Sequence, residues 1–350
     1  MVPITREFQS ESPLHPKAVE LLDEVFSRGW ADPSKIHAAS REAGKLLQDA
    51  KETFSTAFGV RSDEIFFLGE PALGFHLGIS GYLSNSTTLY YSTTDRAPVH
   101  AIVHQREMLG LPNAHIQNPA GTAYDVLTFQ PVNPETGITS KKPDDFLGKV
   151  FVDNTAYGIH SHLPHNWASA IWQSRSWQGP SGLGVLAIRN GGDWRNPLPH
   201  IDASKVPQAF SIPLALASAV AFENFTHDYL ETHASISTLK AKIKRYLHEE
   251  IGEVIVVGEE VETSPNLLSA VIAGIDSERL VNQLNERGIS IDAGSACLSG
   301  GIQPSHVLAA MGLPVVGNIR ITLHPGVNDE SAQNLLTNIK ELVKLQREII

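Results

Sequence analysis

The runs Asp292-Ala-Gly-Ser-Ala-Cys-Leu-Ser-Gly-Gly301 and Asn318-Ile-Arg-Ile-Thr322 carry the chemistry on which the interpretation of this chain turns. Cys297 follows an expected strand over 288–292, and its Gly, Ser and Ala neighbours are typical of an exposed, mobile loop. Arg320 stands between two isoleucines of an expected strand. We therefore expect its guanidinium to point away from the core toward a cleft, where it can hold a carboxylate. The alternative interpretations are that Cys297 is a loop thiol without a function and that Arg320 is an ordinary surface arginine.

Composition narrows the classes of protein that fit this chain. Cys297 is the single cysteine among 350 residues, which excludes an intrachain disulfide and zinc sites built on several cysteines. With 42% hydrophobic and 19% charged residues, the chain can bury a sizeable core. Its 27 Lys and Arg against 38 Asp and Glu give a net charge of −11, which argues against nucleic acid and anionic membranes as partners. The sequence shows neither a secretory signal nor a membrane-spanning apolar run, so we expect a cytoplasmic protein.

The order of apolar patterns predicts two domains. Up to about residue 230, short apolar runs that predict strands alternate with amphipathic helical patterns, which indicates crossover units and a largely parallel sheet. Beyond a long helix expected over 212–248, the pattern changes to a smaller α+β arrangement. We expect a large α/β domain over 16–230 and a small α+β domain over 231–350 that includes 1–15 and carries the Cys297 loop. The expected strands of the large domain are 64–68, 87–91, 123–129, 149–153 and 184–188.

Several runs resemble a known enzyme family. The run GSACLSG at 294–300, the run QPSHVLAAMGL at 303–313 and the run NIRITL at 318–323 are similar to the C-terminal domain of cysteine desulfurases. These enzymes are members of the class V aminotransferase group and depend on pyridoxal phosphate. The resemblance continues through four earlier runs: Asp32-Pro-Ser34 with His37, Val132-Asn133-Pro-Glu-Thr-Gly137, Val152-Asp153, and Gly179-Pro-Ser-Gly-Leu-Gly-Val-Leu-Ala-Ile-Arg189.

The resemblance implies a fold, an assembly and two site residues. The implied fold is that of PLP-dependent transferases, aminotransferase fold type I, with a mainly parallel seven-stranded sheet in the large domain. The implied assembly is a homodimer with its pockets at the subunit interface. In the family, a loop cysteine accepts sulfur as a persulfide and a strand arginine binds the substrate carboxylate. These roles fall on Cys297 and Arg320.

The sequence departs from the family at the lysine that holds the cofactor. The resemblance aligns Ser176 with that lysine and Arg175 with the histidine before it. No lysine stands between Lys149 and Lys205, so a small shift of the alignment does not supply one. A serine has no amine and forms no imine with an aldehyde cofactor.

Other positions of the cofactor site differ as well. By the resemblance, Ala72 replaces the threonine that grips the phosphate, and Glu70 replaces a glycine beside it. Arg96 replaces the histidine that stacks on the pyridine ring, and Ala156 replaces the glutamine that bonds the phenolate. Asp153, the partner of the pyridinium nitrogen, remains, although an aspartate at the end of a strand can equally cap the following turn. Asn133 in the Val-Asn-Pro-Glu run also matches a cofactor-site position.

These changes lead to three hypotheses of function. The first is a protein that has lost PLP binding and catalysis but keeps Cys297 and Arg320, carrying a persulfide or binding sulfur-transfer or iron–sulfur partners. On this hypothesis no cofactor is expected. The second is an enzyme with new chemistry on an anionic small molecule, using Arg96, Arg175, Glu70 and nearby histidines. The third is a PLP-dependent desulfurase or aminotransferase that binds the cofactor without the covalent bond. The sequence leaves open whether the protein turns over any substrate.

A histidine cluster raises the alternative of a metal site. His160 and His162 alternate along an expected extended segment, so they could share one face and one metal, with His165, His76 or His104 nearby in the fold. An ordinary loop is the alternative interpretation, and we predict no metal.

Two further patterns receive structural interpretations. Trp167, Trp172 and Trp177 recur every five residues, which fits neither a helix nor a strand, and we expect them to line the pocket or the subunit contact. The basic run Lys240–Arg245 is expected to be a solvated helix face.

Overall fold

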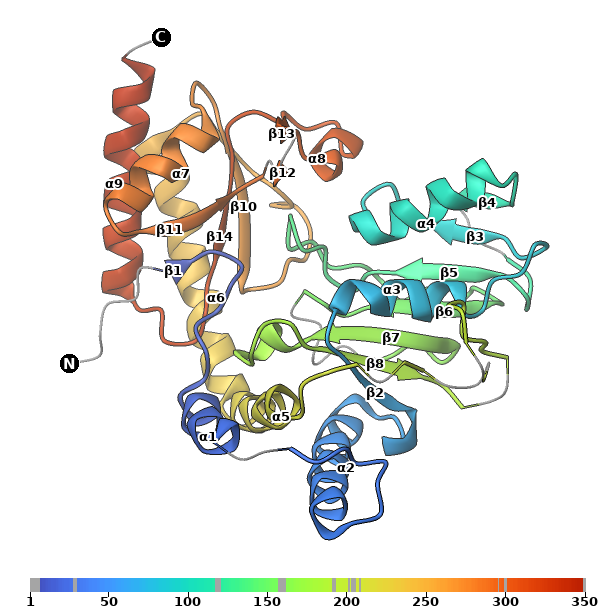
Figure 1. The fold of residues 1–350 in the computed structure, drawn as a ribbon. Coiled ribbons are helices and arrows are strands. Elements are labelled where there is room, and N and C mark those ends of the chain that lie inside the picture. Colours follow the sequence, from blue (N-terminus) through green and yellow to red (C-terminus); the bar gives the residue numbers. More distant parts are fainter. Residues whose placement is uncertain are drawn as a thin grey trace. The chain divides into compact units, whose positions relative to one another are not determined.

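The computed structural model describes residues 7–27, 30–116, 121–156, 162–190, 193–200, 202, 206–207, 209–294, 296–298 and 301–348. The chain forms two compact units (Figure 1). The large unit comprises Leu14–Pro131 and Ser140–His227. The small unit comprises Met1–Pro13, Val132–Thr139 and Asp228–Ile350.

The large unit is built on a seven-stranded sheet with strand order β2-β8-β7-β6-β5-β3-β4. Strand β8 runs antiparallel to both of its neighbours, and every other adjacent pair is parallel. The predicted α/β class and the mainly parallel seven-stranded sheet are therefore confirmed. The strands are β2 (Ile65–Leu68), β3 (Leu89–Tyr91), β4 (Asn113–His115), β5 (Val126–Phe129), β6 (Lys149–Asp153), β7 (Trp167–Gln173) and β8 (Gly184–Ile188).

Five helices accompany this sheet. Helices α1 and α2 pack against α5, whereas α3 packs against β7 and β8 and contacts α4. Helix α2 ends at Gly59, which adopts the left-handed conformation (φ 68°) that closes a helix at little steric cost. The helices are α1 (Pro16–Phe26), α2 (Ala38–Phe58), α3 (Pro71–Ser80), α4 (Ala97–Met108) and α5 (Ile212–His227).

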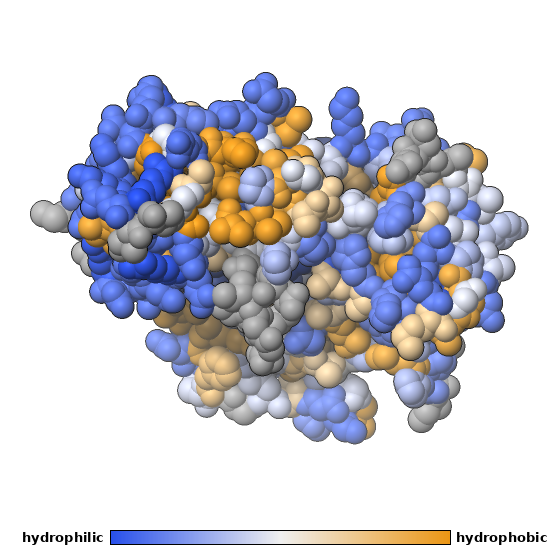
Figure 2. Space-filling model, turned by 90° about the horizontal axis from the view of Figure 1, so that it is seen from above, coloured by the Kyte–Doolittle hydropathy of each residue, from blue (hydrophilic) through white to orange (hydrophobic). Residues whose placement is uncertain are grey.

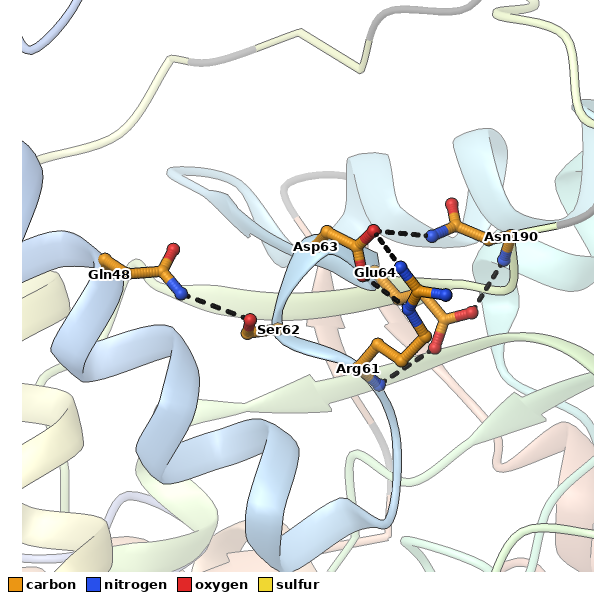
Figure 3. Close-up of polar contacts among 6 residues, drawn as sticks. All are labelled: Gln48, Arg61, Ser62, Asp63, Glu64 and Asn190. Carbon is orange, nitrogen blue, oxygen red and sulfur yellow. Dashed lines mark hydrogen bonds and ion pairs between the residues drawn. The ribbon is translucent and has the colours of Figure 1, made fainter.

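The expected strand 64–68 begins one residue late because Glu64 closes a short 3-10 turn, η1 (Ser62–Glu64). The buried Glu64 carboxylate accepts hydrogen bonds from the backbone N–H groups of Arg61 (2.9 Å) and Asn190 (2.7 Å), as Figure 3 shows. Asn190 follows β8 closely, so this carboxylate ties the start of β2 to the end of the strand paired with it. The exposed side chains of Arg61 and Asp63 form a bidentate ion pair beside this carboxylate (2.9 and 2.8 Å).

An aromatic core between α2, β7 and α5 contains two of the three spaced tryptophans. Trp172 and Trp177 are 1% and 0% exposed. The Trp172 ring stacks on Phe58 with centroids 3.9 Å apart, and Trp177 Nε1 donates to the backbone carbonyl of Ser218 (3.1 Å). The prediction that these residues line a pocket or a subunit contact was wrong for Trp172 and Trp177. They pack in the core because β7 is buried on both faces and leads directly into a tight 3-10 turn.

The small unit contains a five-stranded sheet with strand order β1-β11-β14-β10-β9. Strand β1 is parallel to β11, and the other pairs are antiparallel. Apolar side chains of this sheet and of helices α6, α7 and α9 form its core. The elements are β1 (Glu7–Phe8), α6 (Tyr229–Tyr246), β9 (Val254–Val256), β10 (Leu267–Ile272), α7 (Ser277–Glu286), β11 (Ser290–Ala293), α8 (His306–Ala310), β14 (Asn318–Thr322) and α9 (Asp329–Arg347).

The expectation of a single helix over 212–248 was wrong. Helix α5 ends at His227 in the large unit, and α6 begins at Tyr229 in the small unit. Asp228 between them has φ −93° and ψ 4°, outside the helical region. Since neither Gly nor Pro marks this break, the pattern of apolar residues could not reveal it.

The molecular surface has both polar and apolar regions. The face in Figure 2 is largely hydrophilic and carries separate hydrophobic patches. Large apolar side chains that are well exposed in the isolated chain include Ile36 (92%) and Leu230 (83%). Exposed apolar surface of this kind is typical of contact surfaces when it is contiguous. Among the described residues, no helix combines the length and the apolar character needed to cross a bilayer.

Lys240 does not belong to a solvated helix face. It is 6% exposed, and its ammonium donates to Thr263 Oγ1 (2.8 Å) and to the Ser264 carbonyl (2.5 Å). Burial, together with repulsion from Lys244, lowers the pKa of Lys240 to about 7. The expectation of solvation was therefore wrong for Lys240, although the exposed Lys242 fits it, pairing at the surface with Asp329 (2.7 Å).

This burial predicts a pH dependence of stability. The pKa of Lys240 rises from about 7 in the folded chain to 10.5 on unfolding, so the unfolded chain binds more protons between these values. The contribution of Lys240 to the free energy of unfolding should therefore increase as pH rises from 7 to 10.5. Urea unfolding of Lys240→Met, compared with wild type, should show the loss of this rise. The control Lys242→Met should keep it, and equal pH profiles for wild type and Lys240→Met would refute the assignment.

Candidate functional site

The large unit has a cavity at one edge of its sheet. Strands β2, β3, β6 and β7 run in the same direction, so their carboxyl ends meet at that edge, where open α/β sheets bind ligands. The cavity has a volume of about 280 Å³, and the residues that line it include Glu70, Ala72, Arg96, Gln173, Arg175 and Ser181. The structure thus brings together four residues singled out in the sequence: Glu70, Ala72, Arg96 and Arg175.

Glu70 occupies the amino end of helix α3. It is the N-cap residue, and its Oε1 accepts a hydrogen bond from the Ala72 N–H at 3.0 Å. Pro71 fills the first helical position, so it presents no N–H of its own. The first turn of α3 therefore already has a carboxylate at the place where the helix dipole favours an anion.

Asp153 organises the turn that follows β6. It is 5% exposed, and its Oδ1 accepts from the Thr155 backbone N–H (3.0 Å) and from Thr155 Oγ1 (2.5 Å). Its Oδ2 accepts from Gln130 Nε2 at 3.1 Å. The geometry is that of an aspartate capping a turn, which was one of the two interpretations of this residue.

Thr155 joins this carboxylate to the cavity. Its hydroxyl accepts a hydrogen bond from Arg96 at 2.6 Å while donating to Asp153. A chain of hydrogen bonds therefore runs from the cavity-lining Arg96 through Thr155 to Asp153. Neither Thr155 nor Gln130 was predicted as a site residue from the sequence. The spacing Asp-x-Thr at a strand end is the signal that could have indicated Thr155, since such pairs build local turns.

Ser176 lies buried in the 3-10 turn η3 (Ser174–Trp177). Its hydroxyl donates to the Thr155 carbonyl at 2.9 Å. Ala156, which is 6% exposed, adds no polar side-chain atom to the region. Arg175 in the same turn lines the cavity.

The described residues of the cavity do not fit pyridoxal phosphate. No lysine is found among its described lining residues, so they supply no amine for an imine. At the amino end of α3 they present the Glu70 carboxylate and the Ala72 methyl group, where a bound phosphate would need hydroxyl or amide donors.

A second cleft, in the small unit, contains Arg320. Its volume is about 430 Å³, and Glu11, Glu135, Glu278 and Asp292 line it together with Arg320. Arg320 therefore does point into a cleft from β14. Among the described residues, Arg320 forms an ion pair with Asp292 of the neighbouring strand, whose Oδ2 is 3.8 Å from the guanidinium. This partner was not predicted from the sequence.

Cys297 is part of a strand and not of a loop. It lies in β12 (Ala296–Leu298), which pairs antiparallel with β13 (Gly301–Gln303), and its Cα faces that of Ile302. Gly294 precedes this hairpin, and a Cβ there would approach Asn318 Oδ1 to 1.8 Å. A glycine is therefore required where the chain passes β14 on its way to the cysteine.

The remaining predicted site residues are dispersed. Asn133 belongs to the small unit, where its Oδ1 accepts from the backbone N–H groups of Glu135 and Thr136 (3.0 Å each) and so shapes a turn. His160 lies outside the described residues, and His162 is exposed. His104 is also exposed, 3.9 Å from Glu107. Within the described part of the chain, no group of three His, Cys, Asp or Glu side chains is arranged to hold a metal ion.

Comparisons with known proteins agree with this architecture. The aminotransferase class-V family model matches residues 175–335. A cysteine desulfurase IscS from Dictyoglomus turgidum is 23% identical, covering 98% of this chain and 95% of its own length. An IscS from Clostridium botulinum is 25% identical, with 95% and 92% covered. The chain is thus similar to cysteine desulfurases over nearly its whole length, and residues 175–335 match the class-V aminotransferase family model.

Solved structures share the fold of this chain. A NifS-like protein superposes with a TM-score of 0.82 at 20% identity, covering 97% of this chain and 99% of that one. An apo cysteine desulfurase from Thermococcus onnurineus gives a TM-score of 0.76 at 16% identity, with 97% and 94% covered.

The Arg96–Thr155–Asp153 chain predicts a sensitive position. Thr155 is 4% exposed, and Thr155→Val keeps its shape but removes the hydroxyl that bonds both Arg96 and Asp153. We expect this change to lower the free energy of unfolding by about 1–3 kcal/mol. Thr155→Ser, which keeps the hydroxyl, should cost clearly less. Urea unfolding measures both, and a loss for Thr155→Val no larger than that for Thr155→Ser would contradict this expectation.

Proposed function

We propose that this chain is a desulfurase-like protein that works without pyridoxal phosphate and uses Cys297 to carry sulfur as a persulfide. An active desulfurase would load it, and a sulfur-transfer or iron–sulfur assembly protein would receive the sulfur. We further propose that it acts as a cytoplasmic homodimer. The observation that carries the proposal is the cavity at the edge of the large sheet. Its described lining residues offer no amine and place the Glu70 carboxylate at the amino end of α3.

Charge at the end of α3 supports the loss of cofactor binding. A phosphate dianion placed there would face the Glu70 carboxylate that already accepts the Ala72 N–H. Two like unit charges about 4 Å apart repel by about 4 kcal/mol at an effective dielectric constant of about 20, which applies near a protein surface. Asp153, the residue that the family would use on the pyridinium nitrogen, is engaged by Thr155 and Gln130.

The persulfide step requires no cofactor on this chain. The Cys297 thiolate would attack the outer sulfur of the donor's persulfide, forming a new S–S bond as the donor's S–S bond breaks. The donor cysteine leaves as a thiolate. It can take up the proton that Cys297 lost when it became a thiolate, so the protons balance. No external oxidant or reductant is needed. Support comes from the run GSACLSG at 294–300, which resembles the desulfurase cysteine segment.

The loss of the cofactor predicts a spectrum. Purified protein should show no absorbance band of an internal aldimine and no release of hydrogen sulfide from cysteine in the presence of a reductant. A desulfurase with its active-site lysine, measured in parallel with added pyridoxal phosphate, is the control. Stoichiometric release of pyridoxal phosphate on denaturation would refute the proposal and favour a PLP-dependent enzyme.

The sulfur-carrying role predicts a mass change. Incubation with an active desulfurase and cysteine should add one sulfur atom to Cys297, detected by mass spectrometry and removed by dithiothreitol. Cys297→Ser should gain no sulfur under the same conditions. The role is refuted if the wild-type chain stays unmodified while the donor enzyme is loaded, or if the serine variant gains the same mass.

A second candidate function is the binding of a small anion in the same cavity. Arg96 and Arg175 both line it, against the single carboxylate of Glu70 among the lining residues described. Two guanidinium groups in one concave site favour carboxylate or phosphate ligands. The location at the carboxyl ends of parallel strands is that of many ligand sites.

This candidate predicts stabilisation by anions. Phosphate or succinate should raise the melting temperature of the wild type, and Arg175→Gln should weaken the binding by about tenfold or more. The matched control is Arg189→Gln, because Arg189 lies over the Trp167 ring and is absent from the cavity lining. Equal stabilisation of the Arg175→Gln variant and the wild type would exclude the cavity as the anion site.

A further inference from the structure

The cleft around Arg320 places an acidic side chain where an external carboxylate would be expected. Arg320 lies on β14, between β11 and β10 in the five-stranded sheet of the small unit. Asp292 of β11 is its direct cross-strand partner. Directly opposed residues project from the same face of a sheet, so the backbone register itself holds the carboxylate next to the guanidinium. The 3.8 Å between Arg320 and Asp292 Oδ2 agrees with this placement.

Asp292 is held in position from a second side. The backbone N–H of Ser10 donates to Asp292 Oδ2 at 2.8 Å. Ser10 follows β1, which is paired with β11 beside it, and the neighbouring Gln9 carbonyl is bonded by His324 Nε2 at 2.7 Å. The segment after β1 is therefore fastened at two consecutive residues, and it presents a donor to the side chain of Asp292.

Both members of the pair are largely withdrawn from solvent. Their side chains are 22% exposed for Arg320 and 20% for Asp292. Burial raises the pKa of the Asp292 carboxyl above its usual value, although Arg320 and the Ser10 N–H act in the opposite direction. A partly desolvated ion pair is screened less by salt than one on the open surface.

We propose that Asp292 is a built-in carboxylate ligand of Arg320 that keeps carboxylate-bearing small molecules out of this cleft. An incoming carboxylate would have to share the guanidinium with Asp292 at close range. Among the described lining residues, the other charged ones are Glu11, Glu135 and Glu278, each of which would repel an incoming carboxylate. Asp292 is thus the residue that determines specificity at Arg320. This effect of Asp292 involves residues of the small unit alone and does not depend on whether Cys297 carries sulfur.

This pairing gives Arg320 a different role from the binding of a substrate carboxylate that the family resemblance implies. With Asp292 in place, the guanidinium is paired within the chain, at an ion-pair distance of 3.8 Å rather than through a hydrogen bond. Replacing the charge of Asp292 should convert the same cleft into a carboxylate site, because the guanidinium and the 430 Å³ of space remain.

The test is calorimetric titration of the full chain with propionate. Wild type should bind propionate weakly, and Asp292→Asn should bind it at least about tenfold more tightly, because the amide keeps the shape and removes the competing charge. Asp292→Ser is a second variant that also removes the charge but leaves a smaller side chain, and it should likewise bind propionate more tightly than wild type. Circular dichroism and thermal unfolding check that the variants are folded.

Two matched controls distinguish the effect of the Asp292–Arg320 pair from that of the overall negative charge of the cleft. Glu278→Gln removes a carboxylate from the same cleft without touching the Arg320 pair, and it should change propionate binding much less. The double variant Asp292→Asn with Arg320→Gln should lose the gained affinity. The proposal is overturned if wild type binds as tightly as Asp292→Asn, if Glu278→Gln gives the same gain, or if the double variant keeps it.

Discussion

The direction of the strands in the large sheet is the constraint on which the candidate site depends. Because β2, β3, β6 and β7 run the same way, residues far apart in the sequence reach one edge: Glu70, Arg96, Asp153 and Arg175. The hydrogen bonds that Thr155 makes to Arg96 and Asp153 then connect two of these loops. The cavity follows from backbone topology first and from side-chain chemistry second, as in other open α/β sheets.

The sequence predicted the fold class because strand and helix periodicities are local. It failed where the decisive contact is distant. Strand β7 was missed because a strand buried on both faces shows no alternation of apolar and polar residues. The break at Asp228 has no local signal either. The burial of Lys240 and of Trp172 depends on partners supplied by other elements, and no spacing within their own segments reveals those partners.

The candidate site shows the same division. The grouping of Glu70, Ala72, Arg96 and Arg175 could be predicted, since a resemblance maps each position onto a common fold. The partner of Arg320 could not, because Asp292 lies on another strand and the pairing depends on register. A one-residue slip of β11 would turn that carboxylate to the other face. Register is set by the whole sheet, so the sequence around either residue alone says nothing of the pair.

The amino end of α3 connects structure and function most directly. The first N–H groups of any helix have no partner within the helix and need an acceptor. An enzyme that binds a phosphate there can leave the acceptor to its ligand, but a chain without that ligand must provide one itself. Here Pro71 removes one donor and the Glu70 carboxylate accepts the Ala72 N–H, so the helix end is satisfied by the protein alone. Under the proposed function, Glu70 thus completes the fold where a cofactor would otherwise have done so.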